Sequence, residues 1–410
     1  MRTPRCRFCK SELTTTFADL GMSPLSNSYV SAERAAWMEP FYPLHAYVCK
    51  ECLLVQLEEF ESPRAIFSDY AYFSSYSTSW LEHARDYVAM MTDRFRLDAS
   101  SHVVELASND GYLLQYFLER GMSVLGVEPA ANVAQVAIDK GIRSDVAFFG
   151  VETARRLVAE DRHADLLLGN NVLAHVPDIN DFVGGMRILL APDGIVTMEF
   201  PHLLRLVQGN QFDTIYHEHF SYLSLLTVER VFAAHGLRLF DVEELTTHGG
   251  SIRIFACHHG HKRPPTGRVD ALKAVEAGAG LYDLNTYRSF DARVKQTKLK
   301  LLAFLIEAKR AHKKIVGYGA PAKGNTLLNY CGVRTDFIDF TVDKNPHKQN
   351  RLLPGTHIPI RHPDALLDAR PDYVLILPWN IRDEIMQQTS YIRDWGGQFV
   401  VPIPEVRIAV

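Results

Sequence analysis

The sequence predicts an α/β protein with a doubly wound parallel sheet at its centre, a small metal-binding domain before it and a second α/β domain after it. Three observations predict this order: two Cys-x-x-Cys pairs near the N-terminus, apolar runs that alternate with helical segments from residue 101, and a second strand–glycine–helix pattern from residue 315. A chain of 410 residues is too long for one ordinary core. We therefore expect domains over residues 1–75, 76–260 and 261–410.

The composition narrows the class of protein. Hydrophobic residues make up 47% of the chain and charged residues 22%, which is ordinary globular composition. The formal net charge of −4 provides no field that would collect nucleic acid or anionic lipid. No apolar stretch follows the first residues, and no run approaches the roughly 18 apolar residues of a membrane span. We expect a cytoplasmic protein with no nucleic-acid or membrane partner, and cytoplasmic cysteines are more often metal ligands than disulfides.

Four of the six cysteines form two closely spaced pairs, Cys6 with Cys9 and Cys49 with Cys52. The two-residue spacing lets both thiolates of a pair face one ion, and two such pairs complete a tetrahedral zinc site. Sulfur would fill all four positions, so the zinc is expected to be structural. Unlinked or redox cysteines are the alternative. The 39 residues between the pairs exceed the usual zinc-ribbon spacing, so a folded segment must lie between them.

A patch rich in aromatic and hydroxyl side chains spans residues 70–80 and is too polar for a core strand. An amphipathic helix is expected after it, with apolar residues from Tyr87 to Phe95 along one side. The patch is either an interdomain surface or a lid over a substrate. On the second interpretation, its substrate-binding candidates are Tyr70, Tyr72, Ser74 and Tyr76.

The middle of the chain shows the alternation of a parallel sheet that is covered on both faces. The expected strands are residues 102–107, 124–127, 166–169 and 195–200. The expected helices are residues 112–120, 132–140, 152–160 and 180–190. Ligands of such sheets bind beyond the carboxyl ends of the strands, where helix N-termini point outward.

Three loops at those strand ends carry the candidate cofactor residues. In the first loop small residues allow a close backbone approach and a glycine permits the turn into the helix; the candidates are Glu105, Ala107, Ser108, Asn109, Gly111 and Tyr112. In the second loop the acidic side chain of Glu128, before Pro129, can accept both hydroxyls of a ribose. In the third loop Asn170 and Asn171 suit an amino acid or an adenine edge.

Taken in order, these loops resemble the S-adenosylmethionine site of class I methyltransferases. The match is Glu-x-Ala-x-x-x-Gly, so Ala107 departs from the commoner first glycine. No phosphate-binding GxGxxG motif follows the first strand, which weighs against a dinucleotide. A cofactorless hydrolase is the alternative, but no serine nucleophile elbow supports it.

A cluster of acids and bases, Tyr216, His217, Glu218 and His219, follows the last expected strand of the middle domain. Such residues are costly to bury without a purpose, and near a methyl donor they indicate proton removal. A second metal site is an alternative, although the histidines lack the HExxH spacing. His175 follows the third loop and is expected to reach the same pocket, unless it serves as a capping or packing residue.

The last third of the chain opens with a long amphipathic helix, expected over residues 286–312, and continues into a second α/β unit. Its first strand ends in a glycine-rich turn whose amides favour an anion, with a lysine beside them. The candidates that would hold an anionic ligand, a sugar or a base are Gly317, Gly319, Lys323, Asn325, Thr326, Asp343, Trp379 and Asn380. A purely structural domain is the alternative.

Read together, the motifs resemble one family. The paired cysteines, Glu-Leu-Ala-Ser-Asn-Asp-Gly, Tyr-His-Glu-His, His248-Gly249-Gly250-Ser251 and Gly-Tyr-Gly-Ala-Pro-Ala-Lys-Gly-Asn-Thr occur in one chain. The whole chain resembles the nucleotide-sugar C-methyltransferases that make branched deoxysugars in actinomycete antibiotic pathways. Within that family it is most similar to the C-3′-methylating type found in tetronitrose biosynthesis.

The resemblance implies a class I methyltransferase fold with a zinc-binding domain in front and a Rossmann-like domain behind. It implies a dTDP-linked 3-amino-2,3,6-trideoxy-4-keto hexose as substrate, S-adenosyl-L-methionine as donor, S-adenosyl-L-homocysteine as product, one structural zinc ion and a monomer. A base removes the C-3′ proton and the enolate carbon takes the methyl group. His219 would be the base, with His217 as the alternative; Tyr216 and His175 would hydrogen-bond the enolate oxygen and Glu218 would orient the cluster. His248 and Gly249 would contact the substrate.

Three other classes compete with this expectation. An O- or N-methyltransferase on a small acceptor would keep the donor and discard the enolate. A zinc-ribbon binding protein with a degenerate methyltransferase-like domain would need a damaged donor loop, whereas Glu128 and its loop are intact. A nucleic-acid methyltransferase is disfavoured by the acidic balance and by the lack of a basic stripe.

Overall fold

The computed structural model describes residues 3–62, 74–160 and 163–409. It divides into two compact units, each built from segments that are distant in sequence. Unit 1 contains Met1–Leu13, Cys49–His202 and Phe220–Tyr282, and unit 2 contains Thr14–Val48, Leu203–His219 and Asp283–Val410. The division into residues 1–75, 76–260 and 261–410 stays a prediction, because the compact units cross both boundaries.

Unit 1 is built on a seven-stranded sheet with the strand order β11-β12-β9-β8-β5-β6-β7. Its five strands from β9 to β7 are parallel, while β12 runs antiparallel to both β9 and β11. The strands are β5 His102–Leu106, β6 Ser123–Val127, β7 Ser144–Asp145, β8 Ala164–Asn170, β9 Leu190–Pro201, β11 Leu237–Leu245 and β12 Ser251–His258. This order confirms the predicted class I methyltransferase sheet.

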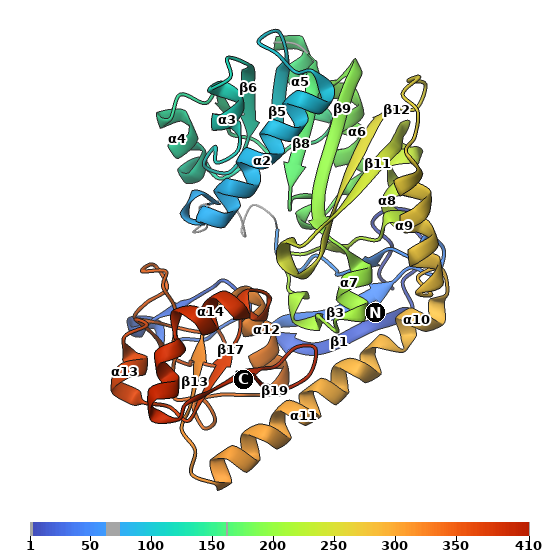
Figure 1. Ribbon diagram of the computed structural model, residues 1–410. Coiled ribbons are helices and arrows are strands. Elements are labelled where there is room, and N and C mark those ends of the chain that lie inside the picture. The colour runs from blue at the N-terminus through green and yellow to red at the C-terminus, as the bar shows by residue number, and fades with distance from the viewer. Residues whose placement is uncertain (1–2, 63–73, 161–162, 410) are drawn as a thin grey trace. The chain divides into compact units, whose positions relative to one another are not determined.

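Helices cover this sheet because their apolar stripes match its apolar faces. The helices of unit 1 are α2 Thr78–Phe95, α3 Leu114–Leu118, α4 Ala131–Asp139, α5 Val151–Glu160, α6 Ile179–Leu189, α8 Leu225–Ala234 and α9 Gly267–Gly278. Helix α2 lies beside β5 and β8 (Figure 1). It buries Tyr87, Val88 and Met91 in one core with residues of those strands, as its periodicity predicted. The side chain of Ser77 caps this helix by accepting from the Trp80 amide.

Unit 2 contains a six-stranded sheet of order β16-β14-β13-β17-β18-β19, in which β19 alone is antiparallel to its neighbour (Figure 1). The strands are β13 Ile315–Tyr318, β14 Thr341–Val342, β16 Ile360–Arg361, β17 Tyr373–Ile376, β18 Gln398–Val401 and β19 Arg407–Ala409. Antiparallel pairs join β1 Thr15–Ser23 to β3 Tyr42–Val48 and β2 Val30–Ser31 to β15 Arg351–Leu352. The parallel part of the sheet matches the α/β unit expected from residue 315.

The helices of unit 2 are α7 Leu203–Gln208, α10 Leu284–Arg288, α11 Phe290–Arg310, α12 Ala322–Cys331, α13 Ala365–Ala369 and α14 Arg382–Gln388. The single helix expected over residues 286–312 is therefore wrong in its start. A short helix, capped by the side chain of Asp283, precedes the long one, and Ser289 separates them. The hydroxyl of Ser289 donates to the carbonyl of Thr286 over 2.8 Å, and such local bonds compete with helix continuation.

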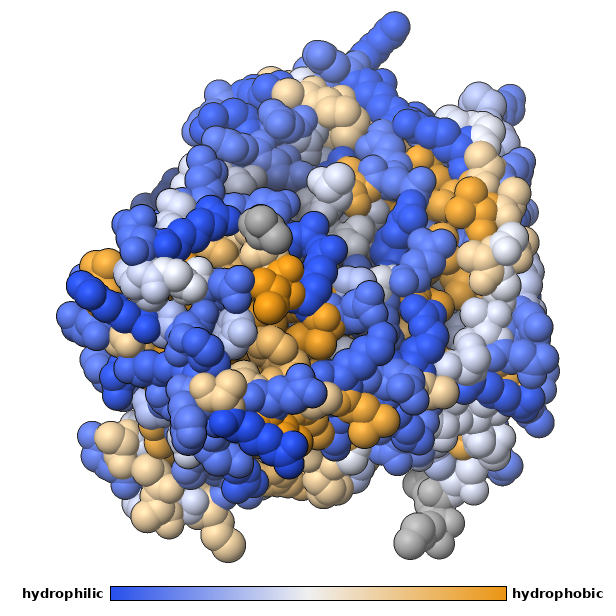
Figure 2. All heavy atoms as spheres, turned by 60° about the horizontal axis from the view of Figure 1, so that its bottom comes forward, coloured by the Kyte–Doolittle hydropathy of each residue, from blue (hydrophilic) through white to orange (hydrophobic). Residues whose placement is uncertain are grey.

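Apolar side chains are dispersed over the surface. Figure 2 shows hydrophilic residues over most of the visible face, with apolar residues in separate patches. Among the described residues, no helix combines the length and the apolar composition that crossing a membrane would require.

Candidate active site

Unit 1 holds the four paired cysteines as one cluster. The sulfur of Cys6 lies 3.5 Å from that of Cys52, and the sulfur of Cys9 lies 3.4 Å from that of Cys49. All four sulfur atoms lie within 4.8 Å of one another. Zinc–sulfur bonds of about 2.3 Å in a tetrahedron place the sulfurs roughly 3.8 Å apart, so the cluster fits a zinc ion. Because sulfur fills every position, the ion is structural and has no open site for water or substrate.

The two halves of the cluster turn in the same way. The residue that follows each pair, Lys10 or Leu53, has a left-handed backbone, and its amide donates to the carbonyl of Cys6 or Cys49. The side-chain amide of Gln56 also donates to the sulfur of Cys6 over 3.2 Å. Outer contacts of this kind orient metal ligands.

The cluster is tied to the loop that carries His175. The guanidinium of Arg7 donates to the carbonyls of Leu57 and Pro177. The side-chain amide of Asn180, on α6, donates in return to the carbonyl of Arg7 over 3.1 Å. Arg7, which lies between Cys6 and Cys9, therefore joins the cysteine cluster to the segment just after His175.

The first strand-end loop has an unusual backbone. Ala107, Asn109 and Gly111 all have positive φ angles, of 55°, 50° and 75°. A left-handed backbone is tolerated by glycine and asparagine but is strained at alanine, by roughly 1–2 kcal/mol. The departure from glycine at position 107 is thus accommodated, and the loop still turns back so that the Ala107 amide donates to the carbonyl of Val127 over 2.8 Å.

Glu128 lies at the end of β6 and faces this loop. Its two carboxylate oxygens accept from the amides of Asn109 and Ala130, both over 2.9 Å. Burial raises the pKa of Glu128, and these two amides lower it again. Each oxygen keeps acceptor capacity beyond one amide. The carboxylate therefore fits the ribose hydroxyls of S-adenosylmethionine.

The third loop adjoins the first through side chains. The amide of Asn170 donates to the hydroxyl of Tyr112 over 3.3 Å, and Asn171 has a left-handed backbone. Glu105 is fully buried within β5, and this burial raises its pKa well above the ordinary value, with a partial offset from the hydroxyl of Tyr112. The structure thus brings the ends of β5, β6 and β8 together with the predicted residues on them.

The aromatic patch is only partly described, because Tyr70 and Tyr72 lie outside the described residues. Ser74 is buried, and its amide donates to the side chain of Asn109 over 2.9 Å, whereas Tyr76 is 71% exposed. The described part of the patch therefore contacts the first strand-end loop.

A polar cluster beside the same sheet edge was missed in the sequence. Glu199, on β9, is fully buried; it binds Nε2 of His83 and the guanidinium of Arg253, each over 2.8 Å, and the hydroxyl of Thr247 over 3.0 Å. Burial alone would raise the pKa of Glu199, but His83 and Arg253 lower it below its ordinary value. No local spacing signals this cluster, because its members come from four separate elements.

The predicted residue His248 adjoins this cluster. Its ring meets that of Trp80 edge-on at 5.4 Å, and Trp80 stacks on His83 at 4.9 Å. His248, Gly249 and Gly250 follow one another with positive φ angles. The glycines of the predicted motif thus permit a backbone that other residues would resist.

The predicted acid–base segment lies in unit 2. Its two end residues, Tyr216 and His219, are partly exposed, while His217 and Glu218 between them are buried. Nδ1 of His219 lies 3.0 Å from the carbonyl of Thr214, and Nε2 lies 2.9 Å from the hydroxyl of Tyr216. A carbonyl can only accept, so Nδ1 carries the proton and Nε2 of the neutral ring is the acceptor.

The buried members face other partners. Both oxygens of Glu218 accept from the side-chain amide of Asn27, over 2.7 and 2.9 Å. Burial raises the pKa of Glu218 to about 7, with a partial offset from Asn27. The Nε2 atom of His217 lies 3.2 Å from the carbonyl of Pro43, and burial lowers the pKa of this ring. Burial thus favours the neutral form of the His217 ring.

The glycine-rich turn of unit 2 collects polar groups. Asp343 accepts from the amide of Ala320 over 2.7 Å, just after Gly319 with its φ of 87°. The ammonium of Lys323 donates to Asn380 over 2.8 Å and lies 4.5 Å from the ring centre of Trp379. These residues form the polar end of the predicted site.

Three other predicted residues are buried and serve the packing of unit 2. A Cβ on Gly317 would lie 2.7 Å from the hydroxyl of Thr341, so this glycine allows close strand packing. Asn325 and Thr326 are each 1% exposed, and the Thr326 hydroxyl donates to the carbonyl of Ile215 over 3.1 Å. The helix after the glycine turn therefore holds the acid–base segment.

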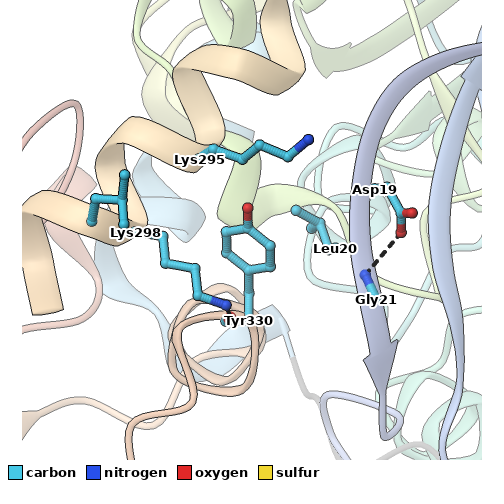
Figure 3. Close-up of a pocket in the computed structure, with 7 residues that line it drawn as sticks. Asp19, Leu20, Gly21, Lys295, Lys298 and Tyr330 are labelled. Atoms are coloured by element: carbon cyan, nitrogen blue, oxygen red, sulfur yellow. Dashed lines mark hydrogen bonds between the residues drawn. The ribbon is translucent and has the colours of Figure 1, made fainter.

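A separate groove of about 520 Å³ opens on unit 2 between β1, α11 and α12 (Figure 3). Lys298 donates from its ammonium to the carbonyl of Tyr330 over 2.6 Å at this groove. The lining residues are Asp19, Leu20, Gly21, Lys295, Lys298, Leu299 and Tyr330. None of the residues predicted from the sequence to act in a site lines it.

Comparison with known proteins gives three family matches along the chain. Residues 6–67 match a "zinc binding domain", residues 80–242 a "methyltransferase domain" and residues 246–404 a "C-methyltransferase C-terminal domain". The C-methyltransferase NovU of Streptomyces niveus is 37% identical over 403 residues, which cover 98% of this chain and 96% of that protein.

Two further likenesses are confined to part of the chain. A ubiquinone biosynthesis O-methyltransferase of Bartonella tribocorum is 26% identical over 118 residues, covering 28% of this chain and 45% of that protein. The solved structure of magnesium protoporphyrin IX methyltransferase from Synechocystis PCC 6803 with bound SAM covers 43% of this chain and 79% of its own, at 13% identity and a TM-score of 0.34.

Proposed function

Because the chain belongs to the family of S-adenosylmethionine-dependent C-methyltransferases with an N-terminal zinc-binding domain, we propose that it methylates C-3′ of a dTDP-4-keto-deoxysugar. The proposed substrate is a 3-amino-2,3,6-trideoxy-4-keto hexose, and the proposed setting is cytoplasmic deoxysugar assembly for an antibiotic. The observation that carries the proposal is the paired geometry of Tyr216 and His219. The motif order that resembles nucleotide-sugar C-methyltransferases supports the sugar.

His219 is the proposed base. A 4-keto group acidifies the C-3′ hydrogen, and removal of that proton leaves an enolate with a nucleophilic carbon. The carbonyl of Thr214 fixes the Nδ1 proton, so Nε2 carries the lone pair and can act as the base without a change of tautomer once the Tyr216 hydroxyl releases it. In His217 the carbonyl of Pro43 holds Nε2, and the other nitrogen, Nδ1, is buried, whereas the ring of His219 is partly exposed. A positioned base is typically worth about 10²–10⁴ in rate.

Tyr216 is the proposed donor to the enolate oxygen, together with His175. Its hydroxyl donates to Nε2 of His219 over 2.9 Å. We infer that the hydroxyl turns to the 4-keto oxygen when the sugar binds, which frees the Nε2 lone pair to take the C-3′ proton and leaves the hydroxyl donating to the enolate oxygen. Glu218, with a pKa of about 7, accepts a hydrogen bond from Asn27 and so holds the buried side of the segment in place.

Unit 1 supplies the donor side of the reaction. When bound, S-adenosylmethionine supplies an electrophilic methyl group to the enolate carbon. Glu128 would hold the ribose hydroxyls, and the loop from Glu105 to Tyr112 with Pro129, Asn170 and Asn171 would line the remainder. The aromatic patch, including Ser74 and Tyr76, would exclude water from the enolate, as would the loop at His248.

Unit 2 would hold the nucleotide diphosphate. Gly319 with Lys323 offers amides and a positive charge, while Asp343, Trp379 and Asn380 frame the sugar or the base. Deleting residues 313–410 would also remove Thr326, which holds the acid–base segment, so a point variant is the sharper test. Lys323→Gln should weaken dTDP binding by about tenfold and leave S-adenosylhomocysteine binding within about twofold. Lys309→Gln, on the surface of α11, is the matched control.

The decisive experiment uses methyl-labelled donor and a panel of dTDP-4-keto deoxysugars. Carbon-detected NMR of the product should show the labelled methyl bonded to a quaternary C-3′. His219→Asn should lower turnover, and solvent deuterium exchange at C-3′ in its presence, by about 10²–10⁴. His312→Asn is the control, since His312 is exposed at the end of α11. A label on oxygen or nitrogen would instead establish an O- or N-methyltransferase.

A further inference from the structure

Asp213 is a buried carboxylate that the reaction scheme leaves unused. It lies on a single 3₁₀ turn, Phe212–Thr214, immediately before the acid–base segment, and it is fully buried. Burial raises its pKa to about 6, against the opposing charge of Lys323 and the indole N–H of Trp379. A charge in such a place is costly unless its partners are well placed, so its surroundings bear on its role.

The carboxylate contacts the 3₁₀ turn Trp379–Ile381, which follows β17. One of its oxygens accepts from the indole Nε1–H of Trp379 over 2.7 Å, although 166 residues separate the two in sequence. The face of the same indole carries the ammonium of Lys323, 4.5 Å from the ring centre. Asp213 is therefore hydrogen-bonded to one of the residues that would hold the nucleotide, Trp379, and Trp379 in turn contacts another, Lys323.

Asp213 is also linked to the proposed base through the backbone of the next residue. The next carbonyl in the chain, that of Thr214, is the acceptor that fixes Nδ1–H of His219 over 3.0 Å. The carbonyl of Ile215 is held in turn by Thr326 over 3.1 Å. Moving the Asp213 side chain would move the carbonyl that selects the tautomer of His219.

We propose that Asp213 is a positioning residue: its hydrogen bond to Trp379 fixes the carbonyl of Thr214, and that carbonyl holds His219 with Nε2 as the acceptor. This inference deepens the proposed function and rests on it, because it takes His219 as the base. Asp213 itself touches neither reacting atom. Its loss should lower turnover while leaving substrate affinity nearly unchanged.

The first test compares three variants of the full-length protein. Asp213→Ala and Trp379→Phe remove the hydrogen bond from either side, and phenylalanine keeps an aromatic face for Lys323. Both should lower kcat by about tenfold or more, and Asp213→Ala should change KM for the dTDP-sugar by less than about threefold, whereas KM of Trp379→Phe does not enter the test because Trp379 is itself proposed to frame the sugar or the base. Asp213→Asn keeps an oxygen that can accept from the indole, so it should retain kcat within about threefold of the wild type. Unchanged kcat in Trp379→Phe would overturn the proposal, as would equal losses in Asn and Ala variants that remain folded.

The second test needs no substrate. Histidine-labelled protein reports which imidazole nitrogen carries the proton, and His219→Asn identifies the signal of His219. In the wild type the Nδ1–H form should dominate, and in Trp379→Phe the signal should show exchange between both tautomers. An unaltered His219 signal in Trp379→Phe would contradict the proposal even if no sugar were methylated. A shifted signal with no sugar methylation would leave the positioning intact and refute the proposed reaction.

Discussion

Gly126, on β6, gives a prediction that sequence reasoning did not reach. A Cβ at this position would lie 2.3 Å from the hydroxyl oxygen and 2.9 Å from the Cβ of Ser108, in the first strand-end loop. Ordinary contacts lie at about 3.5–4.0 Å, so Gly126→Ala must displace Ser108 by roughly 1 Å. Ser108 is fully buried and its amide lies close to Val127, so it has no outward route.

Overpacking of this kind typically costs about 1–3 kcal/mol. Because the displaced residue belongs to the donor loop, the strain should weaken S-adenosylhomocysteine binding by up to about 5- to 150-fold, if it is expressed wholly in the bound state. Calorimetric titration measures that affinity, and thermal unfolding of the same samples measures the part expressed as lost stability.

Ser108→Gly removes the two atoms that the new methyl group would overlap and leaves only the hydroxyl of Ser144, at 3.4 Å. The cost of Gly126→Ala should therefore fall to near zero in the Ser108→Gly background, which a double-mutant cycle measures. Gly278→Ala is the control, since nothing lies within 4 Å of its added Cβ. An equal cost in both backgrounds would show that Ser108 is not the obstacle and would refute this reasoning.

Three further changes test other parts of the molecule. Cys49→Ser should abolish stoichiometric zinc, measured by atomic absorption, and lower the thermal midpoint, because structural zinc contributes directly to folding, while Cys257→Ser keeps the metal. Arg253→Met leaves the carboxylate of Glu199 buried with one cationic partner fewer and should cost about 3–5 kcal/mol in thermal unfolding; a loss below about 1 kcal/mol would contradict the buried pair. Folding raises the pKa of Glu218 to about 7 from the ordinary 4.5, so the stability contributed by its protonated form is full below pH 4.5 and is lost as the pH rises through 7. Glu218→Gln should remove this slope and be the more stable protein at pH 8.5, and a parallel slope in both proteins would exclude Glu218 as its source.

Much of the candidate site could be predicted because its residues belong to short sequence motifs. The zinc cluster, the loop before Gly111 and the segment from Tyr216 to His219 each depend on spacing within a few residues. Residues so close in sequence can be recognised as a group without knowledge of the fold. Four strands of the unit 1 sheet, β5, β6, β8 and β9, followed from apolar runs and helical periods, whereas the strand order and the strands β7, β11 and β12 did not. Residues that act through packing carry no such signal, which is why Gly126 was missed.

The sequence by itself determined the donor fold, the four zinc ligands and the presence of an acid–base segment, because local spacing and hydrophobic period specify them. Only the tertiary structure decided which nitrogen of His219 accepts, because Thr214 and Tyr216 must first be placed around the ring. It also decided that Thr326 points inward and that Trp379 reaches Asp213. Those contacts join residues more than a hundred positions apart, and only the burial of apolar surface by the folded chain brings them within bonding distance.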